Sequence, residues 1–111
     1  MNTSDSVDDI VIEIIHKIKE EFPDFKGVYL FGLFSDGQMH EDEDIELAAI
    51  FENIPSKTER EVIWRLVGET EEMFDVYIDL HPLTISELQH DKEFCDEILK
   101  TGIYFNADLF L

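Results

Sequence analysis

Hydrophobic residues recur along the chain with two different periods, which predict helices and strands in alternation. The first helical period extends from about Val7 to Phe22, where apolar residues three or four apart share one face. The members of this stripe are Val7, Ile10, Val11, Ile14, Ile15, Ile18 and Phe22. Pro23 follows directly, and we expect the helix to end before it because proline lacks an amide hydrogen and clashes with the preceding turn.

Two strand-like segments follow this helix. Residues 27–33 are rich in aromatic and β-branched side chains, which favour a strand. After a polar turn containing Gly37, residues 44–51 alternate. One face of this strand is expected to carry Ile45, Leu47, Ala49 and Phe51, and the other Asp44, Glu46, Ala48 and Ile50. Two acidic side chains are therefore expected on one face.

A second helix and a third strand are predicted next. Ser56 and Glu59 fit a capping box at the start of a helix that follows Pro55. Its expected buried stripe consists of Val62, Ile63, Leu66, Val67, Met73 and Phe74. Residues 75–81 then alternate again, and their acidic face is expected to hold Asp75, Tyr77 and Asp79.

The last predicted element is one helix over about residues 86–100. We expect its inward side chains to be Leu88, Cys95, Ile98 and Leu99. Gly102 is expected in the left-handed conformation that often follows a helix. Cys95 is the single cysteine, so it cannot form an intramolecular disulfide, and it is predicted to be a buried small hydrophobic residue.

Length and composition favour one folded domain over residues 1–111. Hydrophobic residues make up 44% of the chain and include nine phenylalanines, which is enough for a core. The 27 acidic residues against eight Lys and Arg give a formal net charge of −19. Because such a surface repels phosphate backbones, we expect no direct binding to duplex nucleic acid and favour a basic protein partner.

The beginning of the chain carries no targeting signal that we can identify. Residues 1–9 are polar and acidic, without the basic start or the apolar stretch of a signal peptide. No later run is long and apolar enough to span a membrane. We therefore expect no membrane association and a cytoplasmic location.

Candidate chemistry centres on the carboxylates of the second and third strands. Residues two apart on a strand lie about 6 to 7 Å apart and project to the same side, so Asp44 and Glu46 can converge on a divalent cation. Asp79, or alternatively Asp75, could add a third oxygen ligand from a neighbouring strand. Mg²⁺ suits such a site because it is readily shared with substrate phosphates. On composition alone, however, these acids also fit a solvated acidic run.

The residues that precede these acids resemble a known motif. Leu30-Phe31-Gly32-Leu33 is followed by ten residues and then by Asp44-Ile45-Glu46. This pattern resembles the minimal nucleotidyltransferases of the polymerase-beta-like superfamily, whose signature is Gly-Ser, ten residues and Asp-x-Asp. The segment around Asp79 looks like the strand that brings the family's third carboxylate, and Gly102-Ile103-Tyr104 looks like the family's usual ending.

The resemblance implies an α/β (α+β) fold in which a short mixed sheet is backed by helices, as in the polymerase-beta palm. It implies transfer of a nucleotide, AMP above all, from a nucleoside triphosphate to a hydroxyl acceptor. Asp44, Glu46 and Asp79 would be the catalytic residues and would bind Mg²⁺ or Mn²⁺. The expected nucleotide-binding residues are Gly32, Leu33, Ser35 and Gly37. Many small members are antitoxins that bind or adenylylate a HEPN-domain toxin, and such a toxin, or an oligomer of the chain itself, is an expected partner.

Several positions depart from the family pattern. Leu33 replaces the motif's serine and so lacks a hydroxyl for a phosphate oxygen, and residues 36–43 contain no Lys or Arg. Lys57, Arg60 and Arg65 are then the first candidates for a cationic contact to the triphosphate. The alternative function is a weakened or inactive fold that binds a protein through its acidic face or an apolar patch, Leu33, Phe34 and Met39. A third hypothesis is an unrelated acidic domain.

Overall fold

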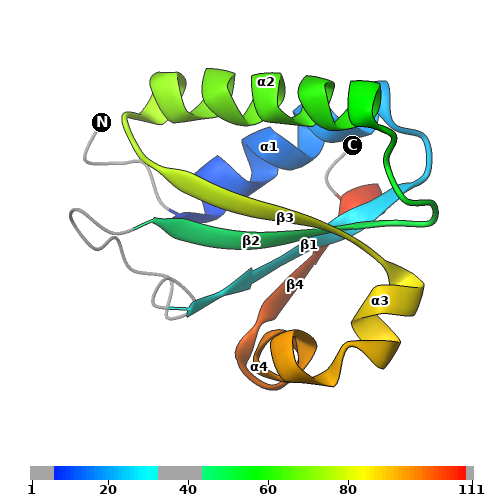
Figure 1. The fold of residues 1–111 in the computed structure, drawn as a ribbon. Coiled ribbons are helices and arrows are strands. Elements are labelled where there is room, and N and C mark those ends of the chain that lie inside the picture. The colour runs from blue at the N-terminus through cyan, green and yellow to red at the C-terminus, as the bar shows by residue number, and fades with distance from the viewer. Residues whose placement is uncertain (1–6, 33–43, 110–111) are drawn as a thin grey trace.

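The computed structural model describes residues 7–32 and 44–109, and four strands in this part of the chain form one sheet (Figure 1). Leu33, Ser35 and Gly37 lie outside the described residues, as do Phe34 and Met39. The elements in chain order are α1 (Val7–Glu21), β1 (Phe25–Phe31), β2 (Ile45–Phe51), α2 (Lys57–Phe74), β3 (Ile78–Thr84), α3 (Ile85–His90), α4 (Lys92–Thr101), β4 (Ile103–Asn106) and the 3-10 helix η2 (Ala107–Leu109).

The sheet is mixed, with strand order β3-β2-β1-β4. β1 pairs antiparallel with both β2 and β4, whereas β2 and β3 are parallel. A parallel pair needs a crossover connection, and α2 provides it between β2 and β3. The predicted fold class, a short mixed sheet backed by helices, is confirmed.

Helices cover both faces of the sheet but unequally (Figure 1). α1 and α2 lie over one face, whereas α3 and α4 lie on the other side. The main core lies under α1 and α2, where every member of the predicted α1 stripe is at most 4% exposed. A smaller cluster on the opposite face consists of Phe31, Ala48, Ile50 and Ile98 of α4. Fully burying one large aliphatic side chain contributes about 1.5 to 3 kcal/mol, so the α1 stripe anchors that helix.

The two predicted faces of β2 are confirmed by this division. Ile45, Leu47, Ala49 and Phe51 belong to the main core, and Ala48 and Ile50 belong to the smaller cluster. β2 is an interior strand of the sheet, so most of its side chains are buried on both faces.

Capping boxes fix the starts of two helices. At α2 the Ser56 hydroxyl accepts from the Glu59 amide at 3.1 Å, and the Glu59 carboxylate accepts from the Ser56 amide at 2.9 Å, as predicted. Thr84 and Glu87 form a second box at α3, with both corresponding distances 3.0 Å. The sequence pattern Thr-x-x-Glu at residues 84–87 would have predicted this second box.

The predicted third strand begins too early. Residue 75 is not in a strand but is the C-cap of α2, where Asp75 adopts a left-handed conformation with φ 54° and donates its amide to the Glu71 carbonyl. Aspartate tolerates this conformation better than most residues, which allows the chain to turn back into the sheet. The strand itself starts at Ile78.

The prediction of a single last helix is also wrong. The helix is interrupted at Asp91, which separates α3 from α4. Cys95 and Ile98 are buried as predicted, but Leu99 is 52% exposed, and Met73 of α2 is 56% exposed. Gly102 is extended, with φ −73°, rather than left-handed. Glycine is needed there for a different reason, because a Cβ atom would collide with the Ile98 carbonyl oxygen.

No helix in the described part of the chain combines the length and the apolar character that crossing a membrane requires.

Candidate active site

Phe31, Glu46 and Asp79 lie side by side on neighbouring strands at one end of the sheet. Glu46 of β2 pairs with Phe31 of β1 on one side and with Asp79 of β3 on the other. Neighbouring strands lie about 4.8 Å apart, so the backbones that carry Glu46 and Asp79 are adjacent although the residues are far apart in sequence. Asp44 is exposed and directly precedes β2. We call Asp44, Glu46 and Asp79 the carboxylate row. The register thus brings Asp79, and not the helix-capping Asp75, opposite Glu46.

The side chains of this row lie on the sheet face away from α1 and α2. Ile45 and Leu47 flank Glu46 in sequence and point into the main core. Because side chains alternate along a strand, Glu46 points to the opposite face, which α4 partly covers through Ile98. Glu46 is partly buried there, whereas Asp79 is exposed.

Gly32 lies at the end of β1 beside Glu46. Its φ is 76°, in the left-handed region that favours glycine. A Cβ atom at this position would overlap the Oε2 atom of Glu46. Gly32 therefore satisfies two local demands, the left-handed backbone at the end of β1 and the space that the Glu46 carboxylate occupies.

Burial and the charges of its neighbours change the pKa of the Glu46 carboxyl group. Burial raises the pKa of its carboxyl group, and the nearby carboxylates of Glu97, Asp79 and Asp44 raise it further. His81 acts in the opposite direction. Glu97 belongs to α4, and the sequence pattern could not assign it to this site because its proximity depends on how α4 packs on the sheet.

His81 is the next residue on the same face of β3. Its Nε2 atom lies 3.2 Å from Oδ2 of Asp79, and its ring centroid lies 6.3 Å from that of Phe31. Its spacing of two residues from Asp79 was the signal that both side chains share a face.

Residues 13–107 match the family described as "Polymerase beta, Nucleotidyltransferase". The chain belongs to this family. The resemblance inferred from Gly32-Leu33 and Asp44-Ile45-Glu46 is thereby confirmed at the level of the family. A search of curated proteins found no significant match.

Solved structures show the same fold at low sequence identity. A chain from a mutant of the toxin–antitoxin MntA-HpeT has a TM-score of 0.65 and 24% identity, with 87% of this chain and 77% of that chain covered. A chain from a toxin–antitoxin with AMP-PNP has a TM-score of 0.64 and 23% identity, with 88% and 77% covered. A third is from the tri-AMPylated Shewanella oneidensis HEPN toxin in complex with MNT antitoxin, with a TM-score of 0.58, 20% identity, and 91% and 76% covered.

The carboxylate row of this nucleotidyltransferase family member fits a divalent cation by its donor type. Carboxylate oxygens suit Mg²⁺ and Mn²⁺. Burial is the main cause of the raised pKa of Glu46, and a cation would relieve the repulsion from neighbouring acids that raises it further. Among residues 7–32 and 44–109, no three His, Cys, Asp or Glu side chains stand close enough to form a complete metal site. Mg²⁺ commonly takes one or two protein carboxylates and completes its shell with water and substrate phosphates, so two acids of the row suffice.

The cationic residues predicted to assist the triphosphate lie elsewhere in this nucleotidyltransferase fold. Lys57 is the first residue of α2, which comes after the carboxyl end of β2. Glu46 lies near the amino end of that strand (Figure 1). Arg65 forms ion pairs with Glu21 at 3.3 Å and Glu69 at 3.5 Å. Lys57 is thus at the other end of the sheet, and Arg65 lies on α2, which covers the sheet face opposite to that of Glu46. The fold does not support the prediction that they contact the nucleotide.

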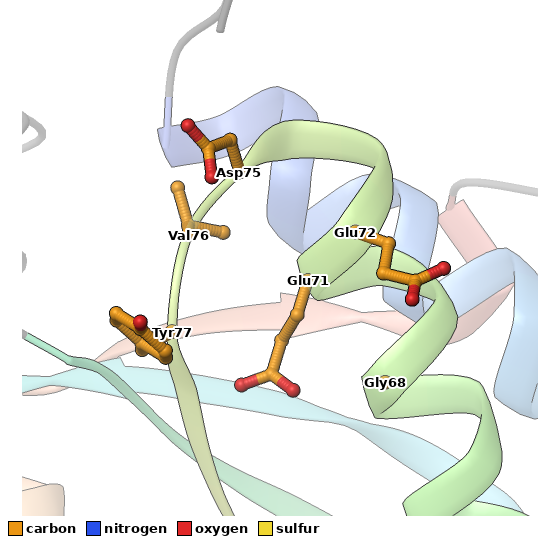
Figure 2. Close-up of a pocket in the computed structure, with 6 residues that line it drawn as sticks. All are labelled: Gly68, Glu71, Glu72, Asp75, Val76 and Tyr77. Carbon is orange, nitrogen blue, oxygen red and sulfur yellow. The ribbon is translucent and has the colours of Figure 1, made fainter.

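A cavity of about 350 Å³ lies outside the carboxylate row, between the end of α2 and the segment that leads into β3 (Figure 2). Its lining residues are Gly68, Glu71, Glu72, Asp75, Val76 and Tyr77. Glu71 reaches from α2 toward the strand, where its carboxylate accepts from the Ile78 amide at 2.9 Å. Three carboxylates line this cavity, and its lining includes none of the predicted site residues Asp44, Glu46 and Asp79.

Proposed function

We propose that this chain transfers a nucleotide, AMP in the first instance, from a nucleoside triphosphate to a hydroxyl group of a protein. The observation that carries the proposal is the row in which Glu46 and Asp79 are paired in register beside the left-handed turn at Gly32. Membership of the nucleotidyltransferase family supports this class of reaction. The row provides the acidic groups, and Gly32 places the end of β1 directly beside the Glu46 carboxylate.

The carboxylates of Asp44, Glu46 and Asp79 would supply ligands for Mg²⁺ or Mn²⁺, of which a bound ion commonly takes one or two. When bound, the cation neutralises charge on the phosphates and favours the ionised form of the acceptor hydroxyl. Gly32, Leu33, Ser35 and Gly37 are the proposed nucleotide-binding residues. Asp79 accepts the proton of the acceptor hydroxyl, since it is the more exposed carboxylate of the pair.

The proposed acceptor is a HEPN-type toxin, for which this chain would be the antitoxin. Two observations support this pairing. Solved structures with this fold include a HEPN toxin in complex with MNT antitoxin, and the toxin in that complex is AMPylated. The net charge of −19 also complements a basic, RNA-cleaving protein. A reaction of this kind, which consumes a nucleoside triphosphate, fits the cytoplasm.

A labelling assay tests the proposal. The protein is incubated with Mg²⁺ and each α-labelled nucleoside triphosphate, alone and with the product of the adjacent gene. We expect label on the partner with wild type, and loss of label with Asp44→Asn or Asp79→Asn. Asp75→Asn is the matched control, since Asp75 caps α2 outside the row, and it should retain transfer. Equal labelling by wild type and both row variants would refute the assigned residues.

A second candidate function is an acidic protein-binding module without turnover. The observations that favour it are Leu33 in place of the motif's serine and the absence of Lys and Arg from residues 36–43. In the same assay, this function predicts tight binding of the partner that survives Asp44→Asn, together with no label from any nucleotide.

A further inference from the structure

The imidazole ring of His81 lies close to Asp79 of its own strand and to Phe31 at the end of β1. Its Nε2 atom is 3.2 Å from Oδ2 of Asp79, an ion-pair distance. The ring is tilted 43° to the ring of Phe31, with centroids 6.3 Å apart. Phe31 is the residue before Gly32, so His81 has one neighbour at the end of β1 and one in the proposed third carboxylate.

The sheet leaves room for this arrangement at Ala48. Ala48 of β2 pairs with His81 and lies between β1 and β3. Backbones two strands apart are separated by roughly 10 Å, which is more than the distance between the two rings. The rings must therefore lean toward each other across β2, and the methyl group of Ala48 allows this where a larger side chain would fill the space.

This contact is poorly placed to stabilise the fold. The side chains of His81 and Asp79 are 37% and 49% exposed, and ion pairs of that exposure contribute little to folding. The group that it contacts directly is the carboxylate of Asp79, which the strand register places beside Glu46. An orienting hydrogen bond to a ligating carboxylate is a recurrent feature of metal sites.

We propose that His81 is a positioning residue that holds the Asp79 carboxylate in its metal-binding orientation. The inference rests on the proposed function, since it concerns the same carboxylate row. His81 acts through its N–H donor, with Phe31 as the support that fixes the ring. It is not itself a metal ligand in this proposal.

Two variants separate the donor from the ring. His81→Gln places an amide N–H near the position of Nε2, whereas His81→Phe keeps a ring against Phe31 and has no donor. Mn²⁺ binding is measured by electron paramagnetic resonance of the free ion, without nucleotide or partner. We expect His81→Gln to bind nearly as wild type and His81→Phe to bind about tenfold or more weakly, the usual effect of losing such a support. His81→Ala, which lacks both features, should also bind weakly.

Each result bears on the inference. Wild-type Mn²⁺ affinity in a folded His81→Phe or His81→Ala protein would overturn it, as would equal weakening by His81→Gln. A nitrogen bound directly to Mn²⁺ in spin-echo spectra would make His81 a ligand and also overturn it, and so would the absence of Mn²⁺ binding in wild type. The result of the labelling assay is independent of these Mn²⁺ measurements, because that assay tests the transferase reaction itself. Loss of Mn²⁺ affinity in His81→Phe, with no transfer by wild type, would support the positioning role and refute the transferase.

Discussion

Replacing Gly32 with alanine tests how the turn at the end of β1 is built. The φ of 76° costs a residue with a Cβ atom about 1 to 2 kcal/mol relative to glycine. The new Cβ would also overlap Oε2 of Glu46. That oxygen is the end of a flexible side chain, so it can move aside cheaply. We therefore expect Gly32→Ala to lower the free energy of unfolding by about 1 to 2 kcal/mol, mainly through the backbone.

Gly68 offers a matched control for the same chemical change. It lies in the interior of α2, and a Cβ atom there would meet nothing within 4 Å. Alanine is more favourable than glycine in a helix interior by about 0.5 to 1 kcal/mol. Gly68→Ala should therefore stabilise the protein, so that two identical substitutions change the free energy of unfolding in opposite directions.

Urea denaturation followed by circular dichroism measures both changes. With an m value of about 1 to 3 kcal/mol/M, the midpoints of the two variants should differ by roughly 1 M. Repeating Gly32→Ala in a Glu46→Ala background separates its two causes. The cost should persist, since the φ angle is unchanged. A neutral or stabilising Gly32→Ala would refute the reasoning, and a cost that disappears without the Glu46 side chain would assign it to the collision.

Three further predictions concern the carboxylates and a helix cap. Because the pKa of Glu46 is raised, its carboxyl group holds a proton more tightly in the native state than in the unfolded chain. The native state therefore loses stability as the pH rises from the ordinary glutamate pKa of about 4.3 through the raised pKa. Glu46→Gln should therefore stabilise the protein near pH 7, with a gain that disappears toward pH 4 in urea titrations. Mg²⁺ should raise the melting temperature of wild type, with about 2.7 kcal/mol of stabilisation at 100 times the dissociation constant, and should raise that of Asp44→Asn less. Ser56→Ala removes the side-chain acceptor for the Glu59 amide, so urea denaturation should show a loss of about 1 kcal/mol.

Features that depend on nearby residues could be predicted from the sequence. The α1 stripe, the two faces of β2 and the cap of α2 all follow from spacings of two to four residues, and the structure shows each of them. The pair Asp44 and Glu46 could be identified in the same way. The motif spacing from Gly32 then indicated the family before any contact between strands was known.

Features that depend on distant packing could not be predicted in this way. β4 was missed because its four residues are recognisable as a strand only through their pairing with β1. Met73 and Leu99 follow helical spacing but are 56% and 52% exposed, because spacing alone does not show how far the covered face of a helix extends. The positions of Glu97 and His81 around Glu46 likewise require the packing of α4 and the parallel register of β3.

The carboxylates of residues 41–46 fit either a solvated acidic run or a site, and the structure separates Glu46 from that run. A solvated run leaves each carboxylate in water with its ordinary pKa. Glu46 is instead partly buried, its pKa is raised by burial and by three other acids, and the adjacent Gly32 is held in a left-handed conformation. A partly buried carboxylate with acidic neighbours is unfavourable for folding, and such groups are typically retained at functional sites. This favours Glu46, more than the exposed Asp44, as the centre of the chemistry.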